Sequence, residues 1–364
     1  MTHELSGVYF SETVSTIDSD IAVDEEEEVC FIVQTSTAIP TLDNQLKYYT
    51  NIGSFKTATN NKGLTKTVAF MERTLALAGK TTFYVYSVKT DTQAGFQEAV
   101  TCSTDIKEIR KIIYYEETAS SNNNTIADKM AALTTACHTT YTYGGFRIAY
   151  VIPAATIEAA VAGAENVSPS ATVVSTFTSL LTGEGDGRLA IMVPDASANV
   201  MSTIISTPFD EDPGKYFLNG TVGELTYQFT REQMKTLLNL GVIFIRPRRR
   251  GGVINYKLEG GITTAFKSDK ADGTLSARQT ADELLHQCDL SLEEIINDKE
   301  ITGNVNDAQT VCDDVIAEFV KNEYVTQAGT QLKAVDAGDM KFTISGKIQT
   351  IKPLRTIEVN TTIN

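Results

Sequence analysis

The chain has 364 residues, 42% hydrophobic and 21% charged, which is enough apolar material for the cores of two or three globular domains. Its formal net charge of −15 disfavours direct binding to nucleic acid, because contacts with phosphate need a basic surface. No apolar run is long enough to insert in a membrane, no signal peptide is expected, and five scattered cysteines without a CxxC pair predict reduced thiols.

The N-terminal residues predict an extended arm. Val8 and Phe10 lie on one side of a strand-like stretch at residues 7–12. An acidic run follows at residues 24–28, which is either a solvated bend or a docking patch for a basic neighbour. Residues 1–28 are therefore predicted to form an arm and a linker.

The next part of the chain alternates between strand and helix patterns. Strands are predicted at residues 29–33, 82–88, 109–115, 146–152 and 189–193. Helices are predicted at residues 64–77, 126–139 and 173–181. This alternation predicts parallel strands joined by right-handed crossovers, hence an α/β outer domain over residues 29–223. Residues 196–223 are rich in turn formers and are predicted to be an irregular connector.

Residues 224–340 predict a second, mixed α/β domain, so the chain is α+β overall. Thr230 has the chemistry of a helix cap and Gly241 that of a helix stop, after which residues 241–246 read as a strand. Two amphipathic helices are predicted at residues 280–296 and 307–324, and their apolar stripes favour a core rather than a binding surface.

The tail at residues 341–364 reads as open strand. Ile348, Ile357 and Val359 belong to its alternating apolar residues. An uncovered strand presents N–H and C=O groups that must find partners. Either the tail folds back into the sheet of its own chain, or it adds a strand to a neighbouring molecule.

No catalytic, cofactor-binding or metal-binding residue is predicted, and no cofactor. The three histidines have no metal-ligand spacing, and no GxSxG motif indicates a nucleophile. The glycine-rich residues 183–188 lack the Lys-Ser/Thr of a phosphate-binding loop and do not directly follow a strand. A flexible turn explains them better.

One basic cluster stands out against the acidic background, and it has two interpretations. Its arginines could occupy a solvated hairpin loop and pair with carboxylates of the same chain. They could also bind an acidic surface on a neighbouring subunit, because a planar guanidinium binds carboxylates bidentately. The residues are Arg246, Arg248, Arg249 and Arg250.

Several segments in this order resemble the contractile tail sheath proteins of phages, phage-tail-like bacteriocins (tailocins) and related contractile injection systems. Residues 7–12 look like the "PGVYVxE" opening without its proline, and residues 29–33 with 82–86 resemble the first α/β unit. Residues 237–245 are similar to "LNxxGINxI", although one residue fewer separates the asparagine from the glycine. Residues 346–357 look like the closing pair of strands, whereas the family's "WGARTL" has no tryptophan counterpart here.

The resemblance implies a structural subunit and not an enzyme. Such subunits form a six-fold helical homo-oligomer around an inner tail tube, bounded by baseplate and tail terminator proteins, and contraction drives the tube through a target envelope. Their C-terminal domain is completed by strands from the N- and C-terminal arms of neighbouring subunits, here residues 1–28 and 341–364. We expect assembly in the bacterial cytoplasm, as part of a virion tail or a released particle. The residues expected to pair in the arms are Val8, Phe10, Ile348, Ile357 and Val359.

Two alternatives remain open from the sequence. The chain could be a cytosolic α/β enzyme whose tail completes its own sheet. It could also be another tail component, such as a tube or baseplate subunit.

Overall fold

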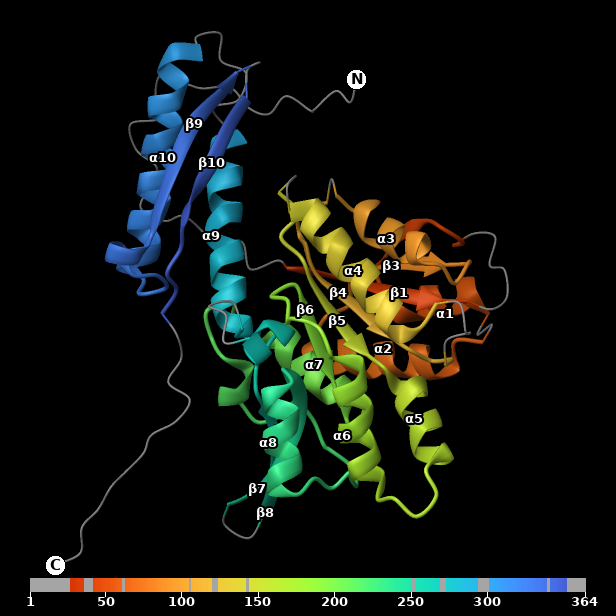
Figure 1. The fold of residues 1–364 in the computed structure, drawn as a ribbon. Helices are drawn as coiled ribbons and strands as arrows, with labels where there is room; N and C mark the ends of the chain where they lie inside the picture. Colours follow the sequence, from red (N-terminus) through yellow and green to blue (C-terminus); the bar gives the residue numbers. More distant parts are fainter. Residues whose placement is uncertain are drawn as a thin grey trace, which may run out of the picture. The chain divides into compact units, whose positions relative to one another are not determined.

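A computed structural model describes residues 27–35, 42–60, 63–104, 106–119, 124–141, 144–250, 253–268, 273–293, 301–338 and 341–351 (Figure 1). They form two compact units. The sheet unit contains the described residues of 27–208 and 213–278, and the C-terminal unit those of 209–212 and 279–351.

An eight-stranded mixed sheet forms the centre of the sheet unit, in the order β2-β3-β1-β4-β5-β6-β7-β8. The six inner strands run parallel, and β2 and β8 pair antiparallel at the two edges. This confirms the predicted α/β class and its parallel crossovers. β6 and β7 pair with each other, although the predicted boundary between the two domains, at residues 223 and 224, lies between them in the sequence. The strands are β1 (Glu28–Gln34), β2 (Leu46–Tyr49), β3 (Phe83–Val88), β4 (Ile109–Tyr115), β5 (Ile148–Ile152), β6 (Leu189–Met192), β7 (Val242–Arg250) and β8 (Val253–Glu259).

Helices cover both faces of this sheet. One face carries α1 (Ile52–Thr59), α2 (Thr65–Ala78) and α7 (Ser197–Ser206). The other face carries α3 (Gln93–Thr101), α4 (Ile126–Tyr141), α5 (Ala154–Gly163), α6 (Pro169–Leu180) and α8 (Arg231–Asn239). Short 3₁₀ turns lie at η1 (Pro213–Lys215) and η2 (Thr264–Ser268).

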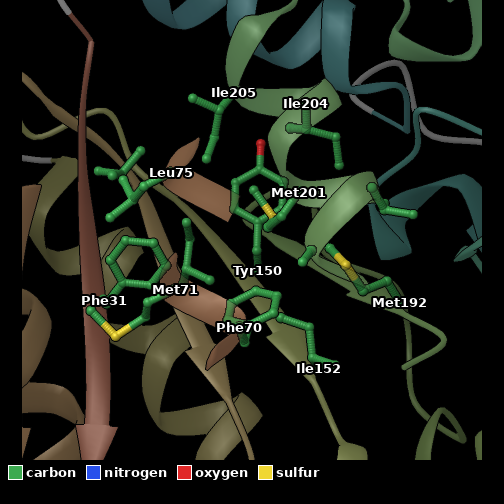
Figure 2. Packing of buried hydrophobic residues seen from close by; sticks show 14 of the residues in the cluster. Phe31, Phe70, Met71, Leu75, Tyr150, Ile152, Met192, Met201, Ile204 and Ile205 are labelled. Atoms are coloured by element: carbon green, nitrogen blue, oxygen red, sulfur yellow. The ribbon is translucent and has the colours of Figure 1, made fainter. Parts of the chain in front are cut away.

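The sheet is buried on both faces, which explains the uninterrupted apolar runs of its inner strands. Along β1, Phe31 belongs to one core cluster, whereas Cys30 and Ile32 belong to the cluster on the opposite face. Figure 2 shows the first cluster, in which Phe31 and Tyr150 of the sheet lie among side chains of α2 and α7.

The prediction that residues 196–223 are irregular was wrong for α7, which is helical. Its residues 197–205 are all buried, so the helix has no polar face to produce a periodic pattern. Its polar side chains bond locally: the Ser202 and Thr203 hydroxyls donate to the Asn199 carbonyl at 2.9 and 2.8 Å. The Asn199 amide donates to the carbonyl of Asn219 at 2.6 Å.

Two long helices and a two-stranded sheet make up the C-terminal unit. They are α9 (Leu275–Glu293), which begins in the sheet unit, α10 (Ile301–Lys321), η3 (Gln327–Gly329), β9 (Gln331–Gly338) and β10 (Lys341–Lys347). Leu284 and Cys288 of α9 pack with Cys312, Val315 and Phe319 of α10. Both helices are thus confirmed, and their apolar stripes face a core as predicted.

The first part of the predicted tail strand folds back on its own chain. β10 pairs antiparallel with β9, and beyond it Thr350 bridges to Val325. The backbone N–H of Ile351 donates to the carbonyl of Tyr324 at 3.1 Å. Residues 352–364 lie outside the described part.

Candidate assembly surfaces

The carboxyl ends of β1 and β4 form the switch point of this doubly wound sheet, where α/β folds commonly bind ligands. A lysine is buried there: Lys129 of α4 donates to Gln34 Oε1 at 2.8 Å and lies 3.2 Å from Asp91 Oδ1. Its third neighbour is the Tyr114 hydroxyl at 3.4 Å. Burial lowers the pKa of Lys129, and Asp91 opposes that shift. All three ammonium hydrogens have acceptors, so the lysine serves as a buried tie between α4 and the sheet.

The described ranges contain no group of three or more His, Cys, Asp or Glu side chains that could hold a metal ion. All five cysteines are free thiols, and only Cys102 is exposed among them, which confirms the prediction of unpaired cysteines. Although the residue as a whole is exposed, partial desolvation of its thiol group, followed by the nearby Glu98 carboxylate, raises the pKa of Cys102 to about 12. No helix in the described part of the chain is long and apolar enough to cross a membrane.

The glycine-rich turn at residues 183–188 is packed against η2. A Cβ on Gly185 would overlap the backbone of Thr264. The Asp186 N–H donates to Thr264 Oγ1 at 2.9 Å, and the Asp186 carboxylate lies 2.7 Å from the His138 ring. Glycine is therefore required by close backbone approach, which the expectation of a flexible turn did not foresee.

The arginine cluster lies on a strand and not in a loop, which corrects the expectation of a hairpin loop. β7 continues through Arg250 and pairs with β8 as far as Val253. The strand period puts Arg246 and Arg248 on one face, together with Lys257 of β8, whereas Arg249 lies on the other.

Glu259 forms ion pairs with two of these arginines. Its Oε2 lies 3.5 Å from Arg246 and 3.9 Å from Arg248, so two guanidinium groups share one acceptor. Arg249 is exposed and forms no salt bridge within the described residues. Residues 244–259 carry five basic residues and one acidic residue, so the hairpin, defined here as β7 and β8, keeps an excess of positive charge.

Apolar side chains accompany this charge. Phe217 forms an antiparallel bridge with Lys257, whose ammonium lies 5.2 Å from the phenyl ring. Phe217 is 43% exposed and Ile254, near the tip of the hairpin, is 56% exposed. Exposed apolar residues beside arginines are typical of protein interfaces. The alternation of Ile254, Tyr256 and Leu258 is the signal from which β8 could have been predicted.

Of the predicted arm residues, only Ile348 lies in the described part. It is half-buried and packs against the core cluster of the C-terminal unit. Val8, Phe10, Ile357 and Val359 lie outside the described residues.

The described end of the acidic run, Glu27 and Glu28, bonds to its own chain. Its Glu27 carboxylate forms an ion pair with the buried Lys111 of β4. Glu28 opens β1, and its side chain accepts a hydrogen bond from Thr82 at 3.0 Å.

No protein-family model matches the sequence, and no curated protein matches it significantly. The fold itself is similar to that of chains in solved structures of sheath and baseplate assemblies. A chain of the six-fold symmetrised anti-feeding prophage baseplate superposes with a TM-score of 0.64 at 14% identity, covering 99% of each chain. A chain of the contracted anti-feeding prophage helical sheath gives 0.63 at 13% identity, again covering 99% of each.

A third similar structure is the contracted PVC sheath complex of an extracellular contractile injection system. The TM-score is 0.62 at 11% identity, covering 100% of this chain and 96% of the other. The resemblance inferred from the sequence is thus confirmed for the fold over the whole length of the chain.

Proposed function

We propose that this chain is a structural subunit of a contractile tail sheath and has no catalytic role. It forms a six-fold helical polymer of identical subunits around an inner tail tube, and contraction drives the tube through a target envelope. The observation that carries the proposal is similarity over 96–100% of each chain to subunits of contracted sheaths.

The basic hairpin is the surface we assign to electrostatic contact. Arg246, Arg248, Arg249 and Arg250 bind an acidic surface on a neighbouring subunit or on the inner tube. Two observations support this assignment. The single carboxylate of Glu259 cannot neutralise the charge of four arginines, and Phe217 and Ile254 nearby are exposed. Because the rest of the chain is acidic, the same contact favours subunit orientations that place the hairpin against an acidic surface.

The arms connect the subunits by strand addition. Val8, Phe10, Ile357 and Val359 pair with sheets of neighbouring subunits, and Ile348 anchors the C-terminal arm where it leaves its own core. A two-stranded sheet is marginally stable alone, and strand addition would enlarge the sheet that β9 and β10 form. Baseplate and tail terminator proteins lie at the two ends of the polymer. The polymer assembles in the bacterial cytoplasm and is part of a virion tail or of a released particle.

Electron microscopy of the purified protein tests this proposal. Long tubes or stacked rings with six-fold symmetry are expected for a sheath subunit. Single six-fold rings that never elongate would favour a baseplate role, which the similarity to a chain of a baseplate structure makes the second candidate. Discrete monomers over a wide range of concentration and salt would contradict both roles and favour the enzyme alternative.

A further inference from the structure

The two-stranded sheet of the C-terminal unit has two outer edges. In an antiparallel pair, the N–H and C=O groups of alternate residues point away from the partner strand. On β9 the backbone groups of Leu332 and Ala334 point outward, because the Leu332 carbonyl and the Ala334 N–H bond to a side chain outside the sheet. Their cross-strand partners are Gly346 and Ile344, so these two point outward from β10.

A glutamine side chain occupies the outer edge of β9. Gln309 of α10 accepts the Ala334 N–H with its Oε1 at 2.9 Å and donates from Nε2 to the Leu332 carbonyl at 3.0 Å. A strand added at this edge would need the same donor and acceptor groups. The second hydrogen of Nε2 reaches Asp313 Oδ1 at 2.9 Å, so both hydrogens of the amide are bonded.

The helix that carries this glutamine is fixed in the core. Ala308 and Cys312, on either side of Gln309, are buried in the cluster that also contains Leu332 and Ala334. Figure 1 shows α10 alongside β9 within this unit. By contrast, the described part of the chain supplies no hydrogen bond to the outward groups of Ile344 and Gly346.

We propose that Gln309 closes the outer edge of β9, so that this sheet accepts a strand from a second copy of the chain only along β10. Unprotected edges pair with the wrong strands, and covering an edge is one way in which proteins prevent this. With the β9 edge closed, β10 is the one edge of this sheet at which a strand can add. This inference rests on the proposed function, which requires strand exchange between copies.

The closing role is tested in the full-length, unassembled chain by amide hydrogen exchange. Gln309→Leu keeps the size of the side chain and removes both edge bonds. We expect exchange at the Ala334 amide to quicken by about fivefold to tenfold, the effect of one lost hydrogen bond. Thr310→Leu is the matched control, because Thr310 is exposed on the same helix and bonds only to its own turn at Asn306. Equal exchange at Ala334 in wild type and Gln309→Leu would overturn the closing role.

A second experiment asks which edge of the sheet accepts the added strand. It uses the wild-type protein, so its result does not depend on the folding of a variant. On assembly, the amides of Ile344 and Gly346 should gain protection, whereas Ala334 should be protected before and after. Gain of protection at Ala334 on assembly would overturn the proposal, since it would mean that the strand adds to β9. Absence of any assembly would contradict the proposed function and strand addition along β10. The comparison of Ala334 exchange between wild type and Gln309→Leu would still decide whether Gln309 closes the β9 edge.

Discussion

At the scale of single residues, the glycine-rich turn shows how close packing can look like flexibility in a sequence. Gly183 and Gly185 stand two positions apart and have opposite surroundings. No atom lies within 4 Å of a Cβ built on Gly183, whereas one on Gly185 would overlap the Thr264 carbonyl. The turn and η2 also share hydrogen bonds through Asp186 and Thr264, at 2.9 and 3.0 Å.

The two glycines therefore give a matched pair of substitutions. Gly185→Ala should lower the free energy of unfolding by roughly 1–3 kcal/mol, because the backbone of η2 must shift to make room. Gly183→Ala should change it by less than about 0.5 kcal/mol. Urea unfolding of both variants measures the difference. Equal stability would mean that η2 moves aside without cost and that the contact is not a tight one.

At the scale of the element, the hairpin of β7 and β8 projects positive charge that its own chain only partly neutralises. Glu259 is shared by Arg246 and Arg248, and Arg249 has no ion pair in the described residues. Exposed ion pairs at such distances contribute little to stability, about 0–1 kcal/mol each. The cluster is therefore expected to matter more for association than for folding.

Charge reversal on the hairpin should impair assembly and leave the subunit folded. In Arg248→Glu/Arg249→Glu, the contact with an acidic partner becomes repulsive, so sedimentation should require at least about tenfold more protein. Arg231→Glu/Lys235→Glu on α8 makes the same change of charge at two exposed positions outside the hairpin and serves as the control.

Salt provides a second check on the same contact. Screening weakens interactions between exposed charges, so the two double variants should differ most at low ionic strength. Assembly of the hairpin variant at wild-type concentrations in low salt would mean that the arginines are merely solvated.

At the scale of the whole molecule, we expect assembly to depend on the segment beyond Ile351. The tail up to that residue belongs to its own unit, through the pairing of β10 with β9 and the bond from Ile351 to Tyr324. Removing residues 352–364 spares these contacts. Main-chain hydrogen bonds and the burial of Ile357 and Val359 would then be lost at every subunit contact of a polymer.

The truncated chain should keep cooperative thermal unfolding and fail to form tubes. Calorimetry and electron microscopy measure the two properties. A chain that lacks only residues 361–364 keeps Ile357 and Val359 and should still assemble. Tubes from the longer truncation would contradict strand exchange by this arm, whereas loss of cooperative unfolding would favour a tail that completes its own sheet.

Much of the architecture could be predicted because local patterns coincide with tertiary roles. Buried parallel strands such as β1 and β4 read as apolar runs, and α8 begins at Thr230 with a complete capping box. α7 could not be predicted, because a helix buried on all sides has no amphipathic period. β9 was missed, and the closure of its edge rests on Gln309, which lies 23 and 25 residues away along the chain.

The sequence by itself determined the α/β class, the order of the main strands and helices, the free cysteines, and the resemblance to sheath proteins, because these depend on composition, periodicity and short motifs. Only the tertiary structure decided that Lys129 is a satisfied buried tie, that the arginines lie on an edge hairpin, and that the start of the tail pairs with β9. Each of these depends on groups brought together from distant positions. Such contacts arise from packing and backbone pairing, which no local pattern encodes.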